Sequence, residues 1–210
     1  MKRQTSKENS SELRHKVARE AATLLYFGQE KEYKQAKVKA AQNLCVHVLP
    51  SNLEIALELD QVAQETEGTQ RAERLIQMRT DALKIMKMLT AFCPVLIGSV
   101  WRGNIRRGSD IDIEVFHDEP DEIVPLLKSA NHKITKSERI TVNEHGKTET
   151  STHIHAETEN NHTVEIVIRP SEFKGRKRTC DTFGDEIKGI KPQELEKLLK
   201  ENPTQQFLPA

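Results

Sequence analysis

Two aspartates two positions apart carry the clearest chemical signal in this sequence. Asp110 and Asp112 lie in the run SDIDIEVF (residues 109–116), where polar and apolar residues alternate. In a β-strand, side chains two residues apart point to the same face, and their positions are separated by about 6.6 Å. Two carboxylates held this close on a rigid strand repel each other unless a cation lies between them. Oxygen ligands suit a hard divalent ion, so the pair predicts a site for Mg²⁺ or Mn²⁺.

A third carboxylate would complete such a site, and Glu165 is the best candidate. It interrupts the otherwise apolar run TVEIVIR (residues 163–169). Burying an unpaired carboxylate there would cost free energy, which favours a cation or a hydrogen-bonding partner. Glu114, on the same face as the two aspartates, and Glu157, on a neighbouring predicted strand, are alternatives. Glu165 could also face solvent or an arginine.

A glycine–serine turn precedes the aspartates. Gly98 and Ser99 follow a short apolar run, and a turn of this kind exposes backbone N–H groups and a hydroxyl that can bind phosphate oxygens. Arg102 and Arg107 add positive charge near the turn, and with Ser109 they are further candidates for binding nucleotide phosphates. An ordinary strand–helix connection gives the same short pattern. The turn therefore supports a phosphate-binding site only in combination with the acids that follow it.

The elements that must position these residues form a mixed sheet. From Pro94 onward the pattern predicts a strand, a turn or short helix, a strand, a helix and three strands. The strands are expected near residues 94–98, 109–116, 132–142, 151–158 and 162–169, and the longer helix over residues 119–130. Residues 143–148 and 159–162 are expected to be hairpin connections.

The first ninety residues read as helices instead. Apolar residues recur there at three- and four-residue steps, and Ser51 with Glu54 forms a capping-box signal. The predicted organisation is an N-terminal helical region over residues 1–90, a catalytic core over 91–170, and a C-terminal basic loop and helix over 171–210. The expected fold class is therefore α/β (α+β), with a mixed β-sheet core preceded by an N-terminal helical region.

Composition narrows the class of protein. The 210 residues are 36% hydrophobic and 30% charged, and 32 Lys and Arg balance 32 Asp and Glu. The zero net charge argues against an extended nucleic-acid-binding surface, but it is compatible with local basic patches. Cys45, Cys93 and Cys180 lie far apart without a CxxC pair, which favours a reducing compartment over disulfides or zinc. No apolar run reaches membrane-spanning length, so we expect a cytoplasmic protein without a membrane partner.

The run IGSVWRGNIRRGSDIDIEVF (residues 97–116) resembles the signature of the DNA polymerase β-type nucleotidyltransferase superfamily. That signature is an apolar residue, Gly, then Gly or Ser, a spacer of about ten residues, and two acids that alternate with apolar residues. The sequence is most similar to the minimal nucleotidyltransferase domains of prokaryotes. The resemblance covers Val95 to Arg169, and the N-terminal helices and the tail after Pro170 lie outside it.

The resemblance implies an activity and roles for particular residues. Members of the superfamily transfer a nucleoside monophosphate from an NTP to an acceptor hydroxyl and release pyrophosphate, and ATP is the NTP expected here. By position, Gly98 and Ser99 would hold the β- and γ-phosphates. Asp110 and Asp112 would ligate two Mg²⁺ ions. Glu165 would ligate one of them and help to deprotonate the acceptor, which makes these three acids the expected catalytic residues.

Several alternatives stay open. The chain could instead be a catalytically weak nucleotide- or RNA-binding regulatory module, including a partner in a toxin–antitoxin pair. The acceptor could be RNA, a protein, a small molecule or another nucleotide, and homo-oligomerisation is also open. The basic loop FKGRKR (residues 173–178) could hold a polyanionic acceptor or could simply be solvated. His153, His155 and His162 are expected to be surface or pocket histidines rather than zinc ligands.

Overall fold

A computed structural model describes residues 2–130, 132–144 and 147–209. His145 and Gly146, in the predicted connection over residues 143–148, lie outside these ranges. The chain divides into two compact units. The first contains the described residues up to Arg71 with Thr179–Asp185 and Pro209, and the second contains Ala72–Arg178 and Glu186–Leu208. The boundaries expected at residues 90 and 170 stay predictions.

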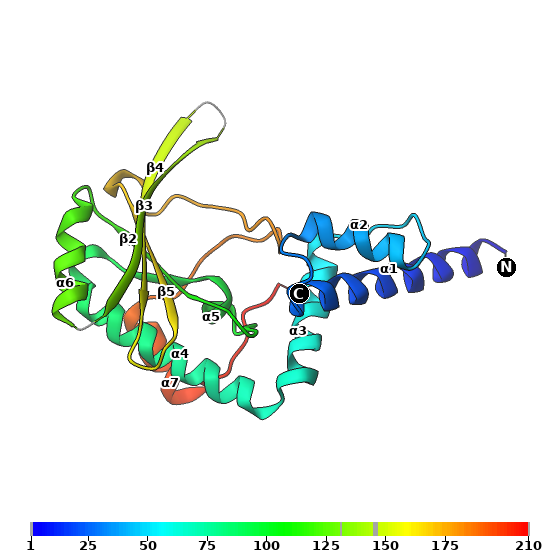
Figure 1. Cartoon of the computed structure of the whole chain (residues 1–210), viewed down its shortest axis with the longest axis horizontal. Coiled ribbons are helices and arrows are strands. Elements are labelled where there is room, and N and C mark those ends of the chain that lie inside the picture. The colour runs from blue at the N-terminus through cyan, green and yellow to red at the C-terminus, as the bar shows by residue number, and fades with distance from the viewer. Residues whose placement is uncertain (1, 131, 145–146, 210) are drawn as a thin grey trace. The chain divides into compact units, whose positions relative to one another are not determined.

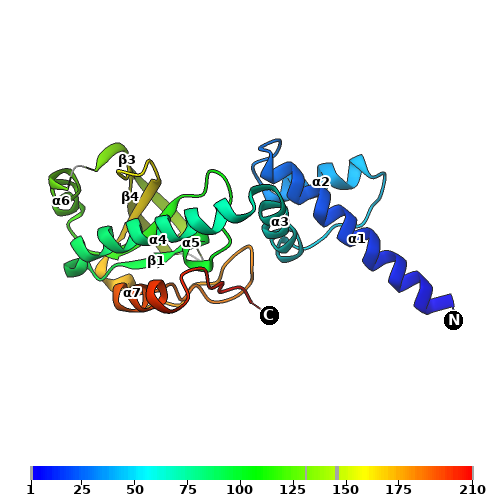
Figure 2. The ribbon, with the colours of Figure 1, turned by 90° about the horizontal axis from the view of Figure 1, so that it is seen from below.

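The first unit is built from three helices (Figures 1 and 2). They are α1 (Lys2–Tyr26), α2 (Tyr33–Asn43) and α3 (Asn52–Glu67). Many of their buried residues are alanines, which lets the helices pack closely. The predicted capping box is confirmed at the start of α3. Ser51 Oγ accepts a hydrogen bond from the Glu54 N–H at 3.1 Å, and Glu54 Oε2 accepts one from the Ser51 N–H at 2.6 Å.

The second unit contains one five-stranded sheet with the order β1-β2-β5-β4-β3 (Figure 1). The strands are β1 (Val95–Ile97), β2 (Ile111–Phe116), β3 (Lys133–Glu144), β4 (Lys147–Glu157) and β5 (Thr163–Arg169). Strands β2 and β5 are parallel and the other neighbours are antiparallel. The predicted mixed sheet and the predicted order of its elements are therefore confirmed.

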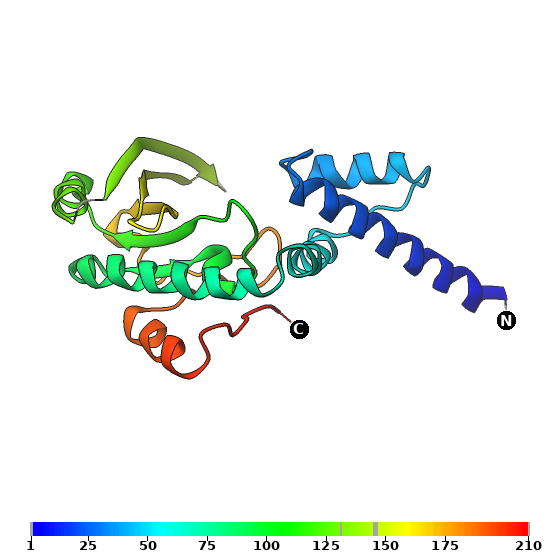
Figure 3. The same ribbon diagram turned by 60° about the horizontal axis from the view of Figure 1, so that its bottom comes forward.

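Helices cover the apolar face of this sheet. They are α4 (Thr69–Met88), α5 (Gly98–Arg102), α6 (Ile123–Ser129) and α7 (Pro192–Glu201), with short 3₁₀ turns at Thr90–Phe92, Pro120–Glu122 and Ser171–Phe173. Alternate residues of β2 and β5, such as Ile113 and Ile166, are buried in one core with side chains of α4 and α7. Figure 3 shows α4, drawn in teal, running alongside the sheet. None of the helices in the described ranges has the length and hydropathy needed to cross a membrane.

A buried arginine fixes α5, the helix that follows β1. Arg79 of α4 is fully buried and donates hydrogen bonds to the carbonyls of Val100 at 3.0 Å and Trp101 at 2.9 Å. It also donates to the carbonyls of Pro203 at 2.7 Å and Gln205 at 2.9 Å, which lie in the C-terminal segment. Burial lowers the pKa of Arg79 to about 10. One guanidinium therefore satisfies carbonyls from two distant segments.

Candidate active site

The strand registers bring Asp112 and Glu165 next to each other. Asp112 of β2 pairs with Ile97 of β1 on one side and with Glu165 of β5 on the other. Paired residues on neighbouring strands share a face, and the strands are about 4.8 Å apart. Asp110 comes just before β2, two residues from Asp112. Asp112 and Glu165 therefore share the face opposite the apolar core, and Asp110 is close enough to act electrostatically on Asp112.

The electrostatics of Asp112 show that these acids interact. Burial is the largest cause that raises the pKa of Asp112, from its ordinary value of 3.8 to about 7, and the negative charges of Glu165 and Asp110 raise it further. Within the described ranges, no three His, Cys, Asp or Glu side chains already form a cluster that could hold a metal ion. Metal binding by Asp110, Asp112 and Glu165 stays a prediction, and a divalent cation is the group that would relieve their repulsion.

The glycine–serine turn touches Asp112 directly. Gly98 has a φ of +69°, and a Cβ at this position would lie only 1.9 Å from Asp112 Oδ2. Both the left-handed backbone and the missing side chain are therefore required here. Ser99 follows in α5 and is half-buried. The segment predicted to bind phosphate is thus in contact with a side chain predicted to bind metal.

The two arginines proposed for phosphate binding differ in their surroundings. Arg102 is only 4% exposed; its guanidinium lies 4.7 Å from the centre of the Trp101 ring and donates to the carbonyl of Phe207 at 3.2 Å. Arg107 is exposed. The observed contacts of Arg102 give it a structural role, and phosphate binding by either arginine stays a prediction.

Ser109 shapes the loop that leads into β2. Its hydroxyl accepts a hydrogen bond from the Arg106 N–H at 2.9 Å, and its own N–H donates to the Arg106 carbonyl at 3.0 Å. These two bonds close a turn directly before Asp110. The observed role of Ser109 is therefore to fix the loop, and its predicted contact with nucleotide is untested.

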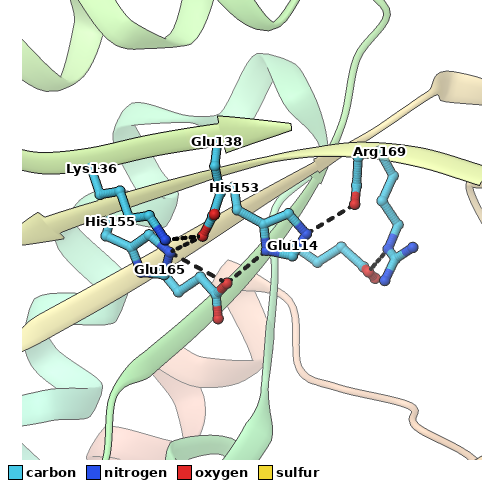
Figure 4. Close-up of polar contacts among 8 residues, drawn as sticks. Glu114, Lys136, Glu138, His153, His155, Glu165 and Arg169 are labelled. Carbon is cyan, nitrogen blue, oxygen red and sulfur yellow. Dashed lines mark hydrogen bonds and ion pairs between the residues drawn. The ribbon is translucent and has the colours of Figure 1, made fainter. Parts of the chain in front are cut away.

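Glu165 has a histidine partner on β4 (Figure 4). His153 Nδ1 lies 2.6 Å from Glu165 Oε1, and His153 Nε2 lies 2.9 Å from Ser151 Oγ. His155 Nε2 is farther away, at 3.9 Å from Glu165 Oε1 and 3.5 Å from Glu138 Oε1. The Glu165 side chain is 27% exposed, so one side faces the histidines while part of it stays accessible. The sequence predicted surface or pocket positions for His153 and His155, but it gave neither of them this role.

The alternative acids have other partners. Glu114 is buried and forms ion pairs with Arg169 and with Arg178, the latter at 2.7 Å. Glu157 pairs with Lys133 at 2.9 Å. The charges of Glu114 and Glu157 are therefore already balanced by basic side chains. Glu165 therefore remains the preferred third acid.

His162 belongs to a structural cluster instead. Its Nδ1 lies 2.9 Å from Asp81 Oδ2, and Asn160 and Thr158 also donate hydrogen bonds to Asp81. Burial opposes ionisation of Asp81, but the hydrogen bonds from Asn160, His162 and Thr158 outweigh it and lower the pKa. The cluster ties α4 to the connection between β4 and β5.

Part of this chain resembles known proteins. A family model described as "Nucleotidyltransferase domain" matches residues 94–200, just over half of the 210-residue chain. No curated protein sequence matches the chain. Among solved structures, a similar one is that of a cytoplasmic RNA terminal U-transferase, with 16% sequence identity and a TM-score of 0.30. The match covers 56% of this chain and 34% of the other, so the chain spans about a third of that protein's length.

Proposed function

This chain belongs to the nucleotidyltransferase-domain family, and on that premise we propose that it transfers a nucleoside monophosphate from an NTP, with ATP as the expected donor, to an acceptor hydroxyl. The observation that carries the proposal is the contact between the Gly98 turn and Asp112, beside Glu165 on the adjoining parallel strand. The turn proposed to bind phosphate thus adjoins the acids proposed to bind metal. Nucleotidyl transfer requires both in one place.

The donor set fits Mg²⁺ or Mn²⁺. Asp110 and Asp112 would hold the ions, with Glu165 as the third ligand, because carboxylate oxygens suit hard divalent cations. The pKa of Asp112 is raised because its carboxyl group is buried near two other acids. A bound cation would lower this pKa, because its positive charge favours the ionised carboxylate. When bound, such ions stabilise the negative charge on the attacking and leaving oxygens.

The chain's own residues would then bind the phosphates and accept the proton. Backbone N–H groups at Gly98 and the Ser99 hydroxyl would hold the β- and γ-phosphates and place the α-phosphorus beside Asp112. The acceptor oxygen would attack that phosphorus as the bond to pyrophosphate breaks, and Glu165 would receive the hydroxyl proton. His153 would keep the Glu165 carboxylate in one orientation. Positioning and charge stabilisation would supply most of the rate enhancement.

A transfer assay tests the proposal. The parent protein is incubated with each α-labelled NTP, Mg²⁺ and a panel of RNA, protein, nucleotide and small-molecule acceptors. We expect label on an acceptor, and at least about a 100-fold loss in Asp112→Asn. Glu157→Gln is the matched control, because Glu157 is a carboxylate on the same sheet that pairs with Lys133. Tight NTP binding without transfer across the whole panel would instead support a regulatory binding module.

A further inference from the structure

A cavity opens on the same side of the sheet as Asp112. Its volume is about 550 Å³, within the range of small-molecule sites. Its floor includes Val95, Ile97 and Phe116, which share the face of Asp112 by strand register. The walls come from the basic loop at residues 174–178 and from residues 186–193.

The walls of this cavity are positively charged. Five basic side chains and two acidic ones line it: Lys174, Arg176, Arg178, Lys188, Lys191, Glu114 and Glu186. Arg178 is neutralised by Glu114, and Glu186 pairs with Lys177 outside the cavity at 3.4 Å. Lys188 and Lys191 are exposed and form no ion pair with another residue in the part of the chain that the structure describes. An apolar floor beneath free cationic groups suits a ligand with an apolar ring and a phosphate.

The cavity adjoins the candidate active site. Ile97 adjoins Gly98 and pairs with Asp112, and Glu114 is two residues along β2 from Asp112, a separation of about 6.6 Å. A ligand in the cavity can therefore place one end beside Asp112. The NTP phosphates are assigned to Gly98 and Ser99, which leaves the cavity to the second substrate.

We propose that this cavity binds the acceptor, and that the acceptor carries a phosphate group, as a free nucleotide or as the terminal nucleotide of an RNA. The role of the ligand as acceptor rests on the proposed function. Binding of a phosphate-containing ligand in the cavity does not. The basic loop of residues 173–178, which the sequence left open between solvation and polyanion binding, contributes Lys174, Arg176 and Arg178 to the wall of this cavity.

Charge reversal in the cavity tests this inference. Lys188→Glu/Lys191→Glu is compared with Lys197→Glu/Lys200→Glu, which changes two side chains of α7 that are 72% and 74% exposed and do not line the cavity. Both pairs are introduced into Asp112→Asn, so that no turnover occurs. AMP and adenosine are titrated by calorimetry, and a fluorescein-labelled 12-nucleotide RNA by anisotropy.

The expected result is at least tenfold weaker binding of AMP or of the RNA in the cavity variant, and less than a twofold change in the control. AMP must also bind at least tenfold more tightly than adenosine if a free nucleotide is the ligand. Binding of the RNA with little affinity for AMP assigns the cavity to an RNA end. Failure of both probes to bind the protein, or equal binding by both variants, overturns the inference.

Kinetics separate this inference from the proposed function. With an acceptor found by the transfer assay, Lys188→Glu/Lys191→Glu is expected to raise the KM for the acceptor at least tenfold and leave the KM for NTP unchanged. A rise in the KM for NTP alone overturns the inference, because the cavity then serves the donor phosphates. Absence of transfer from every NTP refutes the proposed function, while phosphate-dependent binding lost in the cavity variant would still establish the site.

Discussion

His153 holds the carboxylate of Glu165 from the neighbouring antiparallel strand, with 2.6 Å between Nδ1 and Oε1. A carboxylate that ligates a metal only accepts hydrogen bonds, so in that role of Glu165 the His153 Nδ1 would carry the hydrogen. Ser151 Oγ, 2.9 Å from Nε2, fixes the other side of the ring. Partners of this kind orient metal-ligating carboxylates and affect metal affinity.

We therefore expect His153→Leu to raise the Mg²⁺ concentration for half-maximal transfer by about 10-fold or more. His153→Asn should recover most of the affinity, since its amide N–H can occupy the position of Nδ1. His155→Leu is the control, because His155 Nε2 is 3.9 Å from Glu165, beyond hydrogen-bonding distance. The Mg²⁺ dependence of transfer and direct Mn²⁺ titration measure the effect. Identical metal dependence in the Leu and Asn variants of His153 would contradict the assigned role.

Gly98 and Gly108 offer a matched pair of glycine substitutions. Both have positive φ, at 69° and 74°, so alanine at either position costs about 1 kcal/mol or more in backbone strain. Only Gly98→Ala also drives a methyl group into Asp112, since nothing lies within 4 Å of a Cβ at Gly108. We expect Gly98→Ala to lose at least about 100-fold in transfer and Gly108→Ala to stay within a fewfold of the parent. Urea denaturation of both variants reports the accompanying loss of stability.

Asp112 makes stability depend on pH. Its pKa is about 7 in the folded protein and 3.8 ordinarily, so the folded state holds this proton more tightly than the unfolded state. The stabilisation from the protonated form is complete at pH below about 4 and is lost as pH rises towards 7 and above. The free energy of unfolding is expected to fall over this interval by up to about 4 kcal/mol from this group.

Denaturation of the parent and of Asp112→Asn, at pH 4.5, 6 and 8 without metal, isolates that contribution. The variant should lose less stability than the parent over the same range. At pH 8, millimolar Mg²⁺ should raise the Tm of the parent and have little effect on the variant. Parallel pH profiles for the two proteins would show that Asp112 does not titrate as the geometry requires.

Arg79 supports a prediction about stability alone. Arg79→Met leaves four buried or part-buried carbonyls without their donor, and we expect a loss of about 3–5 kcal/mol. Arg79→Lys should recover only part of it, because an ammonium group lacks the planar fork of donors. Lys87→Met is the control, since Lys87 is 54% exposed and its pair with Glu196 is worth less than about 1 kcal/mol. Chemical denaturation provides the measurement.

Local pattern was enough to predict the elements of the second unit, and it also selected the candidate residues of the site. The alternation of polar and apolar residues predicted one face for Asp110 and Asp112, although β2 begins only at Ile111, and the glycine–serine turn was visible as the end of an apolar run. The parallel pairing of β2 with β5 is different, because two other strands separate them in the chain. Only the folded sheet puts Asp112 beside Glu165.

Side-chain partners were harder to foresee. The strands containing His153 and Glu165 were predicted, but their register depends on the turn between them. The orientation of a histidine ring cannot be read from the sequence. Arg79 was not identified, because arginine ordinarily lies at the surface and its acceptors lie in two distant segments. The features that could not be predicted are those set by contacts between residues far apart in the chain.

The strand order has a consequence for how such a protein can diversify. Strand β3 forms the free edge of the sheet, so the β3–β4 hairpin connects at the margin while the acids lie on inner strands. Residues 147–151 of β4 have their register partners on β3, so changes there would alter this margin without shifting the pairing of β2 with β5. One end of the sheet can thus change in sequence while Asp112 and Glu165 stay paired at the other end.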